Sequence, residues 1–307
     1  MKLVEHRFLC RSRKETFKLY VLGDVHIGAL NCAEKELRSM VKRIEEDPYS
    51  YWIGGGDFCD AVILGDVKRF DINTLPNWML KGDPTTIRQR IGDILYEQRK
   101  RWCDIVEPIK HKCLGMIEGN HEYSIFKYHN RDHMAELCRR MSTEDNEVPN
   151  LTDCAFLRLS FDRVSGKRNK ITGEPSCHVQ TVTVFICHGH GGGRGVGAEP
   201  NKLFRLAADK DVDIVLTGHT HTFCILPPTA VLSIPNSGKL PEDAIVREKH
   251  VANWGAYVYT YKSGPSTYAS RANYPVRPMY TVETVIEPHR VSKKRDITRI
   301  TMNEVRL

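Results

Sequence analysis

The chain has 307 residues and is 41% hydrophobic, so it can bury a large core in one elaborated domain or two small ones. Its 45 lysines and arginines against 38 acids give a formal charge of +7, which suits a polyanionic partner. Ten cysteines are scattered from Cys10 to Cys224 without a C-x-x-C pair, which excludes a zinc ribbon or a small disulfide scaffold and indicates reduced thiols.

The organisation of the chain favours a single soluble domain. Residues 1–7 carry charge where a signal peptide needs an apolar stretch, and no run approaches the roughly 18 apolar residues of a membrane span. We find no internal repeat, low-complexity tract or clear linker. We therefore expect one cytoplasmic domain over residues 1–307, without a membrane partner.

A β-α-β unit opens the chain. Residues 17–22 are a short β-branched and aromatic run, which predicts a buried strand. In residues 32–46 the apolar positions recur at intervals of three and four, which predicts a helix that ends before Pro48. Residues 51–53 form the second predicted strand.

Polar side chains follow both of these strands. The first strand ends at Gly23-Asp24-Val25-His26, and the second ends at three glycines followed by Asp57 and Asp60. Glycine lets the backbone turn sharply, and the carboxyl ends of strands are where α/β proteins place ligands. We interpret Asp57 as the bridge between two metal ions.

A long helical insertion over residues 61–112 comes next. Asp83-Pro84 reads as a helix start, and the apolar residues that follow share one face. The other face is basic, with Arg88, Arg90, Arg99, Lys100 and Arg101. Two interpretations stay open, namely a solvated amphipathic helix and a cap that contacts substrate.

Three later predicted strands also end in polar side chains. They are followed by Asn120 and His121 (strand 113–117), His188 and His190 (strand 179–187), and His219 and His221 (strand 213–216). The other predicted elements are helices over 133–141 and 203–208 and strands over 156–161, 257–261, 280–286 and 297–302. We expect residues 226–307 to form a C-terminal β extension.

Several surface segments allow more than one interpretation. The glycine-rich run after His190 lacks the pattern of a nucleotide P-loop, but Arg194 within it is positioned in sequence to reach a phosphate. His190 is either a substrate contact or a loop residue. The basic tip at 166–170 is a solvated turn or a binding element. The aromatic and basic stretch at 268–277 is an ordinary β surface or a place where bases stack.

Five strand ends therefore carry oxygen and imidazole side chains and no thiolate. That donor set fits Mn²⁺, Fe²⁺, Zn²⁺ or Mg²⁺ and argues against a structural zinc site. Two dications about 3.5 to 4 Å apart need an anionic bridge, which Asp57 and a hydroxide can provide. We expect two divalent ions, with manganese preferred over iron, zinc or magnesium.

The order D-x-H, G-D-x-x-D, G-N-H-E, H and G-H-x-H over residues 18–225 resembles the calcineurin-like metallophosphoesterase family. The resemblance implies an α/β fold, a β-sandwich of two mixed sheets flanked by helices. It implies that one metal is held by Asp24, His26, Asp57 and His221, and the other by Asp57, Asn120, His188 and His219. It also implies that His121 protonates the leaving oxygen and that Asp60 orients the His121 imidazole.

The details of these motifs narrow the substrate. Asp60 is followed by Ala61-Val62 and His26 by Ile27, unlike the protein serine/threonine phosphatases. Residues 24–28 and 56–60 resemble the DNA-repair exonuclease branch typified by SbcD, which usually has Asp where Glu122 stands. We predict a phosphodiesterase that hydrolyses DNA or RNA by attack of a metal-bound hydroxide. The alternatives are a small-nucleotide or cyclic-nucleotide phosphodiesterase or phosphatase, and a non-catalytic interaction module on the same fold.

Overall fold

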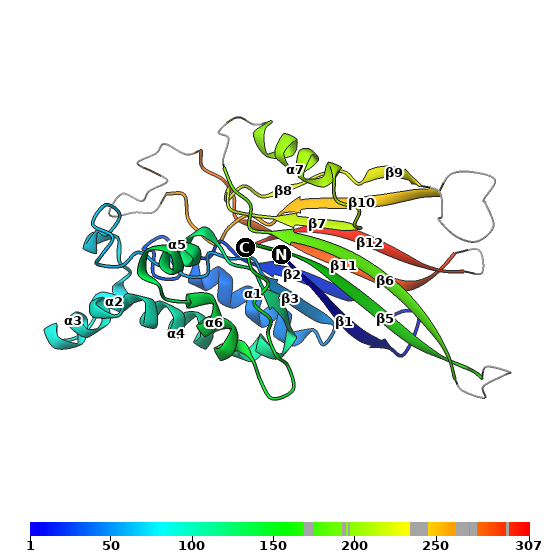
Figure 1. Ribbon diagram of the computed structural model, residues 1–307, viewed down its shortest axis with the longest axis horizontal. Helices are drawn as coiled ribbons and strands as arrows, with labels where there is room; N and C mark the ends of the chain where they lie inside the picture. The colour runs from blue at the N-terminus through cyan, green and yellow to red at the C-terminus, as the bar shows by residue number, and fades with distance from the viewer. Residues whose placement is uncertain are drawn as a thin grey trace.

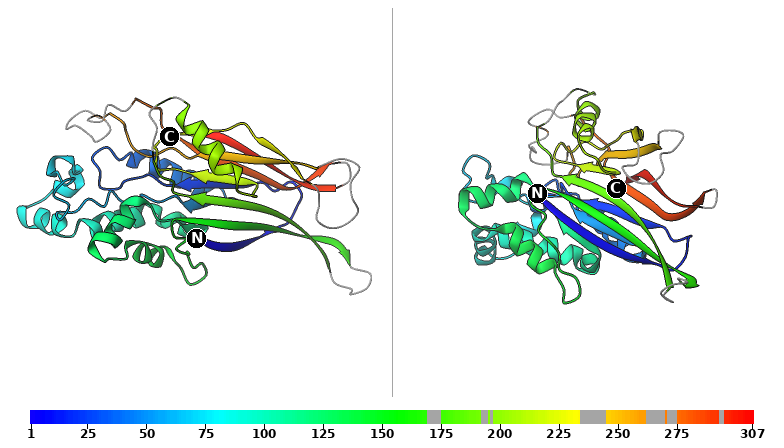
Figure 2. Two further views of the ribbon diagram at one scale, coloured as in Figure 1. Left: turned by 45° about the horizontal axis from the view of Figure 1, so that its top comes forward. Right: turned by 45° about the vertical axis from the view of Figure 1, so that its right-hand side comes forward.

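The protein is described by a computed structural model that covers residues 1–168, 175–191, 195, 197–233, 245–261, 270, 275–292 and 295–307. Two β-sheets lie face to face, and helices cover their outer faces (Figure 1). The predicted α/β sandwich of two mixed sheets is therefore confirmed. Figure 2 shows that helix α7 lies apart from the other helices.

The first sheet has five strands in the order β12-β11-β2-β3-β4. Its parallel part consists of β2 (Phe17–Leu22), β3 (Ser50–Gly54) and β4 (Cys113–Met116), and its antiparallel part of β11 (Tyr280–Ser292) and β12 (Arg295–Arg306). Because β2, β3 and β4 run parallel, their carboxyl ends meet at one edge.

The second sheet has seven strands in the order β1-β5-β6-β7-β10-β8, with β9 paired to β10. Its strands are β1 (Lys2–Cys10), β5 (Cys154–Arg168), β6 (Pro175–Cys187), β7 (Ile214–Thr217), β8 (Cys224–Ile225), β9 (Thr229–Ser233) and β10 (Ile245–Asn253). Strands β6, β7 and β10 run parallel, so their carboxyl ends also share an edge.

The helices of the described residues include short and medium segments. They are α1 (Glu34–Glu46), α2 (Asn77–Leu80), α3 (Pro84–Gly92), α4 (Ile94–Val106), α5 (Asn120–His129), α6 (His133–Met141) and α7 (Ala198–Ala208), with 3-10 turns at Ile72–Thr74 and Glu107–Lys112. In the part of the chain that the structure describes, no helix combines the length and apolar character needed to cross a membrane.

Three apolar clusters hold the layers together. One lies between the sheets and contains Phe17 and Phe161. A second packs α1, α4 and α6 against the five-stranded sheet, and it includes the four apolar residues of α1 that the sequence pattern placed on one face. The third packs α7 on the seven-stranded sheet around Leu203. The layers are therefore helix, sheet, sheet and helix.

The insertion differs from its predicted form in two ways. The structure has two helices where one was predicted after Asp83. Helix α3 ends and α4 begins at Asp93, whose carboxylate accepts a hydrogen bond from Tyr96 N and caps α4. The basic face is also not solvated throughout. Arg99 is buried beside His133 and Glu136, and the Arg101 guanidinium contacts Glu34 at 2.7 Å. Helix α4 is therefore built into the helical layer.

The C-terminal residues are part of the sandwich. Strand β10 joins the seven-stranded sheet, and β11 and β12 join the five-stranded sheet, so the predicted β extension completes both sheets. The strand predicted over residues 257–261 is wrong. Only an isolated bridge pairs Cys32 with Val258, because the backbone there bonds to loops, with Tyr257 N donating to Asp24 O at 3.0 Å.

Candidate metal centre

Residues from five turns meet where the parallel strands end. Three groups of side chains each offer ligand atoms that lie within 4.8 Å of one another. The groups are Asp24, His26 and His221; His26, Asp60 and His121; and Asp57, His188 and His219. The structure thus places the predicted acid and imidazole ligands in one connected cluster.

The backbone of this cluster is held in an unusual conformation. Five of the predicted ligands have positive φ angles between 50° and 71°, namely Asp24, His26, Asp57, His219 and His221. Such angles are uncommon outside glycine, and they gather where function requires them. Backbone hydrogen bonds between the turns, such as Asp24 N to Gly56 O at 2.9 Å, hold the strained residues in place.

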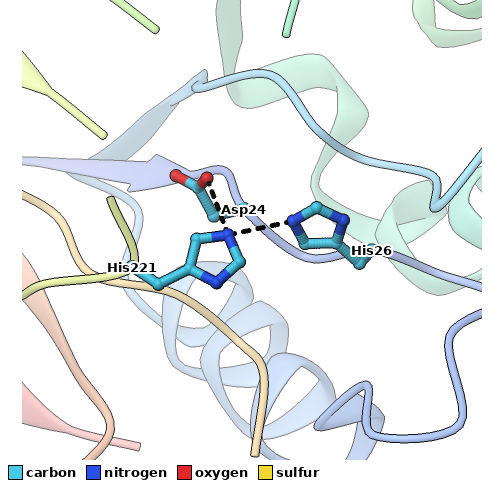
Figure 3. A group of neighbouring side chains, drawn as sticks. All are labelled: Asp24, His26 and His221. Carbon is cyan, nitrogen blue, oxygen red and sulfur yellow. Dashed lines mark hydrogen bonds and ion pairs between the residues drawn. The ribbon is translucent and has the colours of Figure 1, made fainter. Parts of the chain in front are cut away.

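The first ligand group is formed by Asp24, His26 and His221 (Figure 3). The Nε2 atom of His221 lies 3.4 Å from Asp24 Oδ1 and 3.1 Å from His26 Nε2. Asp24 Oδ2 accepts hydrogen bonds from Trp254 Nε1 and His219 N, whereas Oδ1 is buried and has no hydrogen-bond partner among the described residues. A buried carboxylate oxygen that faces two imidazoles fits a divalent cation.

Asp57 lies between the two predicted metal positions. Its Oδ1 atom accepts a hydrogen bond from His121 N, which leaves Oδ2 to face His188 Nε2 at 3.2 Å and His26 Nε2 at 3.8 Å. These two histidines belong to different ligand groups. One carboxylate oxygen therefore faces a histidine of each of two ligand groups. The neighbouring Gly119 is required, since a Cβ there would lie 2.1 Å from Asp57 Oδ1.

The second ligand group adds an amide oxygen. Asn120 Oδ1 lies 3.2 Å from His188 Nε2 and 2.7 Å from His219 Nδ1. The other nitrogen of His188, Nδ1, donates to the carbonyl oxygen of Gly55 at 2.8 Å. That bond fixes the tautomer that leaves the Nε2 lone pair for a metal, as in many histidine sites.

Charge is concentrated in this buried cluster. Burial alone would raise the pKa of Asp57, but His121 and His188 outweigh burial and hold the pKa well below its usual range. Burial would lower the pKa of His188, but Asp57 outweighs it and raises that pKa to about 10. A cation that binds here therefore displaces protons from imidazole nitrogen.

His121 and Asp60 lie beside the first group, but their contact differs from the implied one. His121 Nδ1 donates to the backbone oxygen of Asp60 at 2.5 Å, whereas the Asp60 carboxylate is 4.0 Å from His121 Nδ1 and 3.7 Å from His26 Nδ1. Asp60 thus orients His121 through its main chain. Burial lowers the pKa of His121, but Asp57 and Asp60 outweigh burial and raise it.

Glu122 is a site residue that the sequence analysis did not assign. Its buried carboxylate accepts hydrogen bonds from four backbone amides, which belong to Asp57, Phe58, Cys59 and Gly119, at 2.9 to 3.2 Å. Burial and the nearby Asp57 raise the pKa of Glu122 to about 7. The residue joins the turn that carries Asp57 to the start of α5. Its place at the end of G-N-H-E was the available signal.

Residues at the end of β10 make hydrogen bonds that hold the candidate ligands in place. Trp254 donates to Asp24, and Asn253 Nδ2 donates to Glu199 Oε1 at 2.7 Å and to Thr220 Oγ1 at 2.9 Å. These bonds fix the turn that carries His219 and His221. No sequence signal identified Asn253 or Trp254, because β10 was not among the predicted strands.

The two predicted substrate contacts have different outcomes. His190 is exposed and lines a cleft that begins at the metal centre. Arg194 lies outside the described residues. The candidate ligands as a set fit divalent cations, since they combine two carboxylates, an amide oxygen and four imidazoles, and Asp24 Oδ1 among them accepts no hydrogen bond from the described residues.

Comparisons with known proteins give one family match. The sequence profile of the family described as Calcineurin-like phosphoesterase matches residues 17–223 of the chain. No curated protein matches it.

The chain also resembles solved structures at low identity. A single mutant of Vps29 from Entamoeba histolytica is 11% identical, with a TM-score of 0.33 and coverage of 95% of this chain and 99% of that chain. Vps29 from Cryptosporidium parvum is 14% identical, with a TM-score of 0.32 and the same coverage. The calcineurin-like phosphoesterase YfkN from Bacillus subtilis is 10% identical, with a TM-score of 0.37 and coverage of 94% and 90%.

Proposed function

We propose, from the premise that this chain belongs to the calcineurin-like phosphoesterase family, that it is a binuclear metal-dependent phosphodiesterase with nucleic acid as its leading substrate. The observation that carries the proposal is the position of Asp57 Oδ2 between His26 of one ligand group and His188 of the other. This is the arrangement that a pair of cations with a shared carboxylate requires.

The residues around the cations have separate tasks. When bound, two divalent ions supply Lewis acidity toward phosphate oxygens and lower the pKa of a coordinated water. The chain itself positions the ester and moves a proton. His121 Nδ1 donates a hydrogen bond to the main-chain oxygen of Asp60, so Nε2 is the nitrogen that gives a proton to the leaving oxygen. The oxygen and imidazole donor set suits manganese as well as iron, zinc or magnesium, and we propose manganese.

Two features support a hydrolase over a non-catalytic module. Each ligand position expected from the family motif is filled by an acid, an amide or an imidazole. The structure also holds these side chains within contact distance of one another, with strained backbone that a passive scaffold would not need. The charge of +7 supports a polyanionic substrate over a small nucleotide.

The test is Mn²⁺-dependent hydrolysis of bis-p-nitrophenyl phosphate. We expect activity in the wild type. His121→Ala should lose about 10²- to 10⁴-fold against single-stranded DNA, the usual range for a general acid, and less against bis-p-nitrophenyl phosphate, whose nitrophenolate leaves without a proton. Asp57→Asn should be at least as impaired, and Asp162→Asn on β5 serves as the matched control with unchanged activity. A wild-type protein that is inactive with Mn²⁺ across the pH range would refute the proposal that the chain is an enzyme.

A second set of assays, with a panel of substrates, identifies the substrate class. Single-stranded DNA, duplex DNA, RNA, cyclic nucleotides and p-nitrophenyl phosphate are compared under the same conditions. Hydrolysis of a polymer should fall steeply as salt increases, because phosphate contacts release counterions, whereas hydrolysis of a small nucleotide should depend on salt only weakly. Preference for the monoester over every diester would contradict the phosphodiesterase proposal.

A further inference from the structure

A cleft of about 1100 Å³ leads away from the metal centre. Its inner end is formed by the ligands Asn120 and His188 and by Gly189. Helix α7 contributes Lys202 and Arg205 to its lining, and helix α5 contributes Tyr123. The cleft is thus continuous with the metal centre, and its walls carry groups that the hydrolysis itself does not use.

Lys202 is placed unusually close to the metal ligands. Its Nζ atom is buried and has no hydrogen-bond partner in the described part of the chain. The atom lies over Gly189, where a Cβ would come within 3.2 Å of Lys202 Nζ and 2.7 Å of Thr217 Oγ1. Gly189 has a φ of +92°, so both its conformation and the space favour glycine. An ammonium group that is buried without a partner is costly, and an anion in the cleft would remove that cost.

The basic and acidic residues that line the cleft come from different elements. Arg205 lies three residues after Lys202, so both point from the same face of α7. Asp209 on the same side is paired with Lys210 at 2.6 Å. The other acids of the lining, Glu118 and Asp153, come from the loops that follow β4 and precede β5. An anionic group therefore prefers the α7 side.

Helix α5 contributes an aromatic ring to the cleft. Tyr123 is 50% exposed although it lines the cleft, and it lies on the first turn of α5, two residues after the proposed proton donor His121. A cleft that combines exposed aromatic rings with cationic side chains is a usual means of holding single-stranded nucleic acid, because every base can stack on a ring while the backbone contacts the cations.

We infer that Lys202 and Arg205 bind the phosphate next to the scissile one, and that Tyr123 stacks a base, in a single-stranded polynucleotide. This inference rests on the proposed function and specifies its substrate. A small diester has no phosphate next to the scissile one, so we expect the two kinds of substrate to respond differently to changes in the cleft.

The experiment compares a single-stranded hexanucleotide, as DNA and as RNA, with bis-p-nitrophenyl phosphate. Lys202→Ala should raise KM for the hexanucleotide about tenfold, the size of a charge-assisted hydrogen bond, and leave kcat/KM for the small diester within about twofold. Lys202→Arg should restore most of the loss. Lys42→Ala on α1, an exposed lysine of the opposite helical layer, is the matched control and should change neither substrate.

Binding without catalysis gives a second measurement. In EDTA, fluorescence anisotropy of a labelled hexanucleotide should show a salt slope that is smaller by about 0.7 in Lys202→Ala, as expected for one lost contact to a single strand. Tyr123→Ala should weaken binding about tenfold while Tyr123→Phe keeps it, since stacking needs the ring and not the hydroxyl.

The outcomes separate the two proposals. Suppose that the small diester is hydrolysed and that Lys202→Ala changes the kinetic constants for both substrates equally, or for neither. The cleft assignment is then wrong, and the phosphodiesterase proposal stands. If no ester is hydrolysed but the wild type binds the hexanucleotide through Lys202, the enzyme proposal is wrong and the binding surface stands. Equal binding by the wild type and Lys202→Ala refutes the inference.

Discussion

The two ends of the sandwich contrast sharply in how they treat polar groups. At one end, five candidate metal ligands, none of them glycine, have positive φ angles, and the carboxylates of Asp24, Asp57 and Glu122 are buried. At the other end, the long antiparallel pairs β5–β6 and β11–β12 extend away from the helices (Figure 1), and their described residues include no non-glycine residue with positive φ. Toward the far end of β11, Glu287 is half-exposed and pairs with Arg290 and Arg299.

The difference reflects what each end is built to do. An antiparallel ladder satisfies its own backbone groups, so its side chains are free to be solvated and its conformation is relaxed. The site end gathers strained turns and like-charged acids, which lowers stability until cations bind, and such trade-offs are common at functional sites. Four predictions test this contrast, in order of expected size.

The largest effect is expected for Glu122→Gln. The carboxylate of Glu122 now accepts hydrogen bonds from four backbone N–H groups, and in the variant the side-chain NH₂ would face two of them, donor against donor. Each buried donor left without an acceptor costs about 1 to 3 kcal/mol. We expect a loss of about 3 kcal/mol in the free energy of unfolding, measured by urea titration. Glu287→Gln at the other end should cost less than about 0.5 kcal/mol. Equal losses of unfolding free energy in the two variants would contradict the proposed difference between the two ends of the sandwich.

Metal binding should stabilise the fold nearly as much. At a Mn²⁺ concentration of about 100 times Kd, binding to the native state alone contributes about 2.7 kcal/mol. Asp57→Asn should lose most of this gain, because we propose Asp57 as the ligand common to both metal positions. Asp162→Asn should retain it. Urea titration with and without Mn²⁺ measures the gain, and a full gain in Asp57→Asn would exclude the shared ligand.

Trp254→Phe should weaken Mn²⁺ binding about 10- to 100-fold, the usual effect of removing a hydrogen bond to a metal ligand. The indole N–H now donates to Asp24 Oδ2 at 2.7 Å. Trp52→Phe is the matched control, since the buried Trp52 N–H donates to Ile109 O away from the site. Isothermal titration calorimetry measures both affinities. Similar losses in the two variants would show that general packing, and not the bond to Asp24, sets affinity.

The smallest effect concerns His133, which contrasts with His188. Burial, then Arg99 and Arg131, lower the pKa of His133 to about 3, whereas Asp57 raises that of His188. Below a pH of about 6.5 the unfolded chain binds a proton that the folded His133 does not, so stability falls as pH falls toward about 3. Between pH 7 and 5.5 the loss is about 1 kcal/mol.

His133→Gln should remove that part of the pH dependence. Urea titrations of the variant and the wild type at pH 7 and 5.5 give the two slopes, and their difference isolates His133 from the other titrating groups. Identical slopes would mean that His133 is protonated in the folded protein, contrary to its burial beside Arg99.

The sequence pattern was most reliable where a short motif follows a buried strand. The helix over 133–141 and the strands before Asp24, Asp57 and His219 lie where the periodicity placed them. Strand β1 was not predicted, because its charged residues mask the alternation, and helix α5 was not predicted because it begins within the ligand motif itself.

By itself the sequence determined the candidate ligands and their order, because each group of ligands follows a local apolar run, and the resemblance of these motifs to a known family implied the fold class. Only the tertiary structure decided that Glu122 accepts from four amides, that Trp254 supports Asp24, and that Asp60 holds His121 through its main chain. It also placed Lys202 beside Gly189. These contacts join residues that are far apart in the chain or depend on backbone direction, and local periodicity carries no information about either.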